Sequence, residues 1–193
     1  MPEIRTRLVR ISVWRSPFSS TASIVHLLSL AIRLVVLCAL VWLAVTDVRS
    51  RRLPTRVVLA VGALFFLDAA TLRLTFDQVI VHLGLALGVF LVCAALFAAK
   101  MLGGGDAKLA SVIFLWAGLS LALPALTLIS VIGTVVSLVS LATRNMNPDQ
   151  PSRPLRALAM FSGARGVPYG VALAFGGGVA IVLPAVLPLI LKR

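Results

Sequence analysis

The sequence predicts an all-α protein, a polytopic membrane helix bundle with about six transmembrane helices. Of its 193 residues, 60% are hydrophobic, and the mean hydropathy of the chain is +1.08. Apolar runs of about 17–25 residues suffice to cross a bilayer as helices, and several such runs alternate here with short basic loops. We therefore expect one membrane domain over residues 24–193. The preceding residues 1–23 form an N-terminal tail that is either disordered or interfacial.

Six apolar segments are the candidate spans, at about 24–46, 57–72, 79–99, 106–123, 124–142 and 169–191. Pro124 is expected to open the fifth, because a proline in the first turn of a helix leaves no N–H unsatisfied. Residues 143–168 are rich in proline and arginine and form the long loop, in which 155–161 could be a short interfacial helix. Small residues spaced four apart in the last span predict close helix packing.

The charge distribution orients the bundle and argues against nucleic acid as a partner. The net charge is +12, from 18 basic and 6 acidic residues, but the chain has no nucleic-acid module and no basic patch interleaved with aromatic residues. Basic residues gather instead in the loops after the first, third and fifth spans, as the positive-inside rule requires of cytoplasmic loops. We expect these loops to contact the lipid bilayer. Both termini are then expected outside, although the arginines of the N-terminal tail conflict with the positive-inside rule.

The cysteine and histidine residues predict no metal site and no cofactor. Cys38 and Cys93 each lie inside an apolar segment and form no C-x-x-C pair, so a disulfide framework or a thiolate zinc site is not expected. His26 and His82 do not have the spacing of metal ligands.

Two of the few acidic residues stand out by position. Asp47 ends the first span and Asp106 begins the fourth. If the first span ends inside, the fourth begins inside, so both residues lie at the same membrane face. Each has a simpler explanation: Asp47 could be a solvated helix end, and Asp106 could be a helix cap. However, Gly103, Gly104 and Gly105 directly precede Asp106. Three consecutive glycines at membrane depth permit unusual dihedral angles and the close approach of a peptide.

Paired carboxyl groups from two helices fit peptide hydrolysis. When such groups lie together they share one proton; the ionised group activates water, and the protonated group assists the carbonyl and the leaving amine. Helix dipoles alone predict that the resting proton lies on Asp47, at a helix C-terminus, rather than on Asp106, at an N-terminus.

Three short motifs carry a family resemblance. Gly103-Gly104-Gly105-Asp106, followed by Ala107-Lys108-Leu109, resembles the G-x-G-D-x-K-L motif of the prepilin leader peptidases, which are GxGD membrane aspartic proteases. Thr46-Asp47-Val48-Arg49, followed by Arg52-Leu53-Pro54, resembles the segment of their first aspartate. Pro168-Tyr169-Gly170 is similar to the P-[YF]-G that opens their last helix. The resemblance covers about residues 35–185.

The resemblance implies a catalytic pair, Asp47 and Asp106, that removes the leader of type IV prepilins from the cytoplasmic side of a bacterial inner membrane. It makes Lys108, Pro168, Tyr169 and Gly170 candidates for the border of the active site, although a lipid-headgroup role for Lys108 is the simpler one. Thr55 stands where the family usually has Asn. The chain lacks the four-cysteine segment of the large methylating enzymes and is more similar to the short Flp/Tad-type form, so N-methylation is unsupported.

Two other function classes stay open at this point. The chain could be a catalytically silent assembly factor of a pilus or secretion system, with components of that system as partners. It could also be a small proton-coupled transporter that uses both aspartates as a relay, although no inverted internal repeat is detectable. Intact aspartates and glycines favour the peptidase.

Overall fold

The computed structural model describes residues 18–50, 53–142 and 169–191, and side chains for 24–50, 53–142 and 169–186. Five helical elements make up this part of the chain: α1 (Phe18–Ser50), α2 (Thr55–Thr71), α3 (Phe76–Ala98), α4 (Gly104–Ala142) and α6 (Tyr169–Leu191). The predicted all-helical class is thereby confirmed. The expected N-terminal tail up to residue 17 and the whole long loop 143–168, with its interfacial helix, lie outside the described residues.

The predicted number of about six spans is not confirmed. Four helices are long and apolar enough to cross a membrane, over Ile24–Ser50, Phe76–Ala98, Gly104–Ala142 and Tyr169–Val186. α2 has 17 residues, which is at the lower limit for a span. The predicted fourth and fifth spans form one helical element, α4, which contains an internal break.

The break in α4 lies at Gly118 and not, as the sequence predicted, at Pro124. Gly118 has φ 60° and ψ −177°, whereas Pro124 lies inside a helical segment. This backbone conformation is open to glycine and closed to proline, whose ring fixes φ near about −65°. We call residues 104–117 the first arm of α4 and residues 119–142 the second arm.

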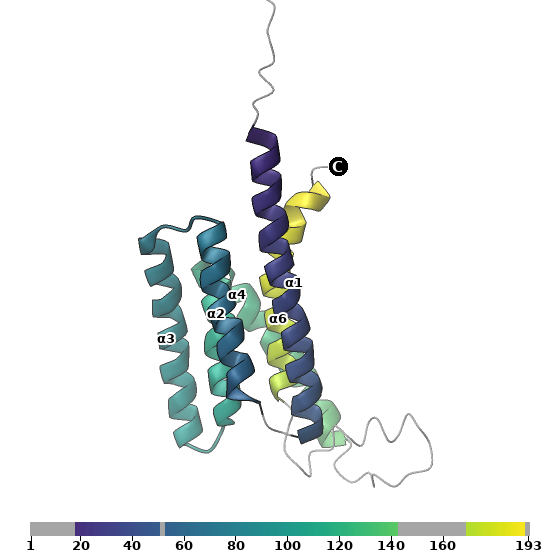
Figure 1. The fold of residues 1–193 in the computed structure, drawn as a ribbon. Helices are drawn as coiled ribbons and strands as arrows, with labels where there is room; N and C mark the ends of the chain where they lie inside the picture. Colours follow the sequence, from purple (N-terminus) through teal and green to yellow (C-terminus); the bar gives the residue numbers. More distant parts are fainter. Residues whose placement is uncertain (1–17, 51–52, 143–168, 192–193) are drawn as a thin grey trace, which may run out of the picture.

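The second arm runs back along α6. A Cβ atom built on Gly177 would lie 2.7 Å from the Ile113 side chain of the first arm, and one on Gly176 would lie 2.6 Å from Ile129 of the second arm. Both arms therefore pack on the same level of α6, and the two ends of α4 lie at the same end of the bundle (Figure 1). The predicted close packing of the last span is thus confirmed at these glycines.

Side chains of α2 and α3 hold the break in place. Nδ1 of His82 lies 2.7 Å from the carbonyl oxygen of Leu115, and the indole N–H of Trp116 donates to the carbonyl oxygen of Val61 at 3.0 Å. The ring of Phe65 contacts both His82 and Trp116. The first contact gives the carbonyl oxygen of Leu115, next to the break, a partner, and the second gives the buried indole N–H of Trp116 an acceptor.

A buried ion pair joins three helices. Arg33 of α1 donates to Oδ2 of Asp68 at 2.9 and 3.2 Å, and it also donates to the carbonyl oxygen of Ile181 in α6 at 2.8 Å. The Asp68 side chain is 4% exposed and that of Arg33 15%. A charge inside a bilayer is costly unless it is paired, so this contact explains how the first span accommodates an arginine.

The turn from α3 to α4 is sharp. Lys100 has φ 59°, its N–H donates to the carbonyl oxygen of Phe97, and the N–H of Met101 donates to that of Leu96. This is a Schellman arrangement with lysine in the position that usually holds glycine. The positive charge at a helix C-terminus is electrostatically favourable, and the turn delivers the chain directly to Gly103.

Candidate active site

Asp47 and Asp106 line the same small cavity. It has a volume of about 370 Å³, and its lining comes from the end of α1, the start of α2 and the start of α4: Asp47, Leu53, Thr55, Gly103, Gly104, Gly105, Asp106 and Lys108. The structure therefore brings together the two predicted aspartates, the three glycines and Lys108. Leu53 is a member of this lining that the sequence did not single out.

A backbone group of α6 positions Asp47. The carboxyl group is buried, and the N–H of Gly170 donates to its Oδ2 at 3.0 Å. A Cβ atom on Gly170 would lie 2.7 Å from that same oxygen and 2.9 Å from Cγ. Only glycine allows the helix backbone this close to the carboxyl group, so Gly170 contacts Asp47 directly, and its place at the border of an active site stays a prediction.

Asp106 lies in the first turn of α4 and packs against its own glycine loop. A Cβ atom on Gly103 would lie 2.7 Å from Oδ2 of Asp106. The other carboxyl oxygen, Oδ1, is buried and has no hydrogen-bond partner among the described residues. One oxygen of a carboxyl group that lines the cavity therefore has hydrogen-bonding capacity that is unused within this part of the chain.

The three glycines are needed for close approach and not for unusual dihedral angles. Among the described residues the only glycine with positive φ is Gly118. A Cβ atom on Gly104 would lie 3.2 Å from the ring of Phe97, and one on Gly105 would lie 3.0 Å from Cβ of Leu53. The loop therefore does not use the left-handed φ values that glycine permits, while the close approach of a substrate peptide stays a prediction.

Lys108 and Thr55 connect two helices beside the cavity. The ammonium group of Lys108 donates to Oγ1 of Thr55 at 3.3 Å, which ties the first arm of α4 to the start of α2. This gives Thr55 a defined contact in the position where the family usually has Asn.

Of the other predicted border residues, Tyr169 and Gly170 do not line this cavity. Pro168 lies outside the described residues. Tyr169 is 40% exposed, and its hydroxyl lies 3.6 Å from the position of a Cβ atom on Gly133. Tyr169 instead lines a second cavity of about 800 Å³.

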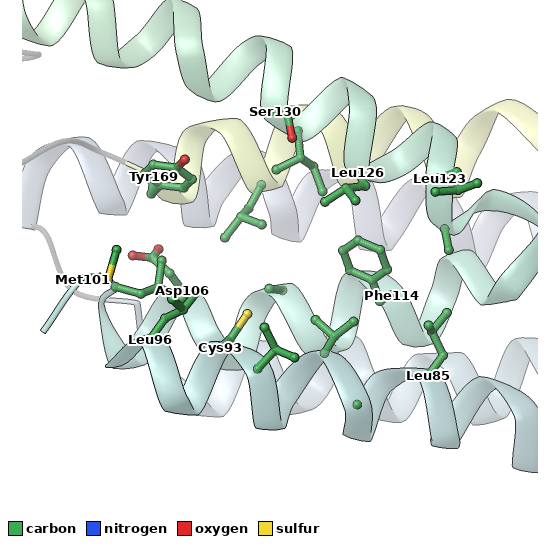
Figure 2. Close-up of a pocket in the computed structure, with 18 of the residues that line it drawn as sticks. Leu85, Cys93, Leu96, Met101, Asp106, Phe114, Leu123, Leu126, Ser130 and Tyr169 are labelled. Carbon is green, nitrogen blue, oxygen red and sulfur yellow. The ribbon is translucent and has the colours of Figure 1, made fainter. Parts of the chain in front are cut away.

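This second cavity meets the first at Asp106, which lines both. Figure 2 shows Asp106, Tyr169 and Met101 at one end, and Leu123 and Leu85 at the other. No local sequence pattern indicates this cavity, because its walls come from α3, both arms of α4 and α6.

Within the described ranges, no group of three or more His, Cys, Asp or Glu side chains has the arrangement of a metal site. The chemical groups gathered at the small cavity are thus two carboxyl groups, a lysine, a threonine and backbone N–H groups. Carboxyl pairs of this kind are suited to proton transfer to and from a bound water molecule.

Comparison with known proteins agrees with this chemistry. Neither the curated proteins nor the solved structures yield a match to the chain. The model of the type IV leader peptidase family matches residues 34–138, which is more than half of the chain. The matched stretch contains Asp47, the glycine loop and Asp106, and it ends before α6. This match shows that the chain belongs to the type IV leader peptidase family, whose members are peptidases that act on prepilins.

Proposed function

We propose that this protein is an aspartic endopeptidase that cleaves the leader of Flp-type prepilins at the cytoplasmic face of the inner membrane. The main support for the proposal is that Asp47 of α1 and Asp106 of α4, which are distant in sequence, line the same cavity. Family membership supports leader-peptidase activity in general. The aspartic type, the substrate class and the membrane face are the parts that we add.

The hydrogen bonds of the two carboxyl groups support distinct roles. An N–H that donates to a carboxylate stabilises its ionised form, and Asp47 receives such a bond from Gly170. An ionised Asp106 would leave the charge on a buried oxygen without a partner among the described residues, which is costly. We therefore assign the base to Asp47 and the acid to Asp106, the reverse of the assignment that helix dipoles alone predict.

Hydrolysis then proceeds by two proton transfers. Asp47 takes a proton from water as the water oxygen attacks the scissile carbonyl carbon, while Asp106 donates its proton to the carbonyl oxygen. Collapse of the tetrahedral intermediate breaks the C–N bond. The leaving amine takes the proton held by Asp47, and Asp106 regains its proton from the intermediate's hydroxyl group.

Basic residues support the cytoplasmic placement of the cavity. Arg49 lies in the last turn of α1, Lys100 in the turn before α4, and Lys108 at the cavity itself. Lysine and arginine concentrate on the cytoplasmic side of membrane proteins and meet anionic lipid there.

The first test is cleavage of a co-expressed prepilin. Asp47→Asn and Asp106→Asn should each abolish processing while the variants still insert into the membrane. Asp77→Asn is the matched control, because Asp77 lies in the first turn of α3 and should leave processing unchanged. Normal processing by either of the first two variants would refute the aspartic mechanism. A pilus-assembly defect with intact processing would instead favour the assembly-factor reading.

The proton assignment has its own measurement. Infrared spectra should contain a protonated-carboxyl band that is lost in Asp106→Asn and kept in Asp47→Asn. The opposite pattern would show that Asp47, and not Asp106, holds the resting proton.

A further inference from the structure

The larger cavity is an apolar groove that the described chain leaves unfilled. It has a volume of about 800 Å³ and lies between α3, the two arms of α4 and the start of α6 (Figure 2). Its α3 wall is a continuous stripe from Gly84 to Leu96, which at about 1.5 Å per helical residue is about 18 Å long. Leu123, Leu126 and Ser130 of the second arm form part of the opposite wall.

Two glycines of α3 face this groove without a packing partner among the described residues. A Cβ atom on Gly84 or Gly88 would meet nothing within 4 Å. The glycines of α6 differ, since a Cβ atom on Gly176, Gly177 or Gly178 would lie within 2.9 Å of a neighbouring side chain. α3 has no buried residue at all. Glycines four residues apart let a second helix approach closely, so α3 presents a helix-packing face that no described element occupies.

The position of Asp106 identifies the kind of molecule that would fill the groove. Asp106 lines both cavities, so a chain that lies in the groove reaches the two aspartates at its end. The groove is apolar over most of its length and runs along α3, a candidate membrane span. Its occupant therefore is apolar, lies along the membrane helices and continues into a peptide bond at the carboxyl pair.

Resting on the proposed function, we infer that this groove binds an apolar helical segment of the substrate that adjoins the scissile bond. The groove is long enough for about three helical turns of that segment. Gly84 and Gly88 then determine specificity, because they set how closely the substrate helix approaches α3. Packing of this segment in the groove then holds the scissile bond at Asp106.

Filling the groove tests this inference. Gly88→Leu places a side chain into open space, so it should fold, and Gly84→Leu provides a second filled variant. Ala95→Leu is the matched control, because Ala95 is an exposed residue of α3 that does not line the groove. Two substrates are compared: a full-length prepilin in proteoliposomes, and a short peptide that spans the scissile bond and lacks the apolar segment.

The filled variants should cleave the full-length prepilin at least about tenfold more slowly, which corresponds to losing the burial of about two methylene groups. They should cleave the short peptide at the wild-type rate, and Ala95→Leu should match wild type on both. Equal slowing of both substrates, or no slowing, would overturn the inference and would point to lipid or packing in the groove. Failure of the wild-type enzyme to cleave the full-length prepilin would refute the proposed function instead.

Cross-linking gives a readout that does not depend on cleavage. Cys93 lines the groove, whereas Cys38 is exposed on α1, so a Cys38→Ser background leaves one thiol at the groove. In this background with Asp106→Asn, Cys93 should form disulfides with single cysteines placed three or four residues apart in the substrate helix. Absence of cross-links, or equal cross-linking at every position, would overturn the docking site.

Discussion

Replacement of Gly170 by alanine isolates the contact between α6 and the carboxyl pair. The new Cβ atom would lie 2.7 Å from Oδ2 of Asp47, and ordinary van der Waals contact begins at about 3.4 Å, so the carboxyl group or the helix must move by about 0.7 Å. Gly170 is held within α6, and Asp47 is buried, so neither group has open space to move into.

The size of the effect follows from this displacement. A misplacement of about 1 Å at a reacting group can slow an enzyme about 100-fold. The hydrogen bond from Gly170 would weaken as well, and such bonds to charged groups contribute about 1.5–3 kcal/mol, or about 10- to 100-fold in rate. We expect Gly170→Ala to cleave prepilin at least about 100-fold more slowly than wild type.

The assay pairs cleavage with folding. Initial cleavage rates are measured by gel shift on purified protein in proteoliposomes, and thermal melting reports on the fold. Alanine is favoured over glycine in a helix by about 1 kcal/mol, so helix propensity alone does not lower stability. Gly62→Ala is the control, because its Cβ atom would meet only Val112 at 3.5 Å or beyond. A Gly170→Ala variant that melts normally and cleaves at the wild-type rate would refute the role assigned to this contact.

Three further predictions concern the rest of the bundle. Arg33→Met should lower the free energy of unfolding by about 3–5 kcal/mol, because it leaves Asp68 buried and unpaired. Adding Asp68→Leu should restore most of the loss. A double variant that is as unstable as the single variant in thermal melts would contradict this prediction. Gly118→Ala should cost roughly 1–3 kcal/mol from backbone strain, and the loss should persist in a His82→Ala background, since strain remains when the contact is gone. An unchanged melting temperature would show that the backbone at position 118 does not require glycine. Lys108→Met removes an exposed hydrogen bond to Thr55 and should slow prepilin cleavage less than about tenfold; a loss as large as that of Asp106→Asn would place Lys108 in the chemistry.

The sequence was sufficient for the class of protein and for the choice of candidate residues. Long apolar runs and a scarcity of acidic residues are properties of the linear chain, and transfer of each segment into a bilayer depends mainly on its own composition. Asp47 and Asp106 stood out because few other acids exist and because glycines precede one of them. Their shared cavity supports the prediction of a pair, while their catalytic role stays a prediction.

The turn inside α4 shows where local reasoning failed. Proline is a strong local signal, so Pro124 was the natural place for a helix to begin. The chain breaks at Gly118 because His82 of α3 and Trp116, held by α2, fix the turn there. Those contacts join residues that are far apart in sequence, and no local pattern encodes them.

What the sequence by itself determined is therefore the helical membrane class, the family resemblance and the two carboxyl groups. Only the tertiary structure decided that Gly170 holds Asp47 and that a groove left open by the described residues leads along α3 to Asp106. The physical reason is that hydropathy and helix propensity act residue by residue along the chain. The meaning of a glycine, in contrast, depends on what lies opposite it: a carboxylate at Gly170, and open space at Gly88.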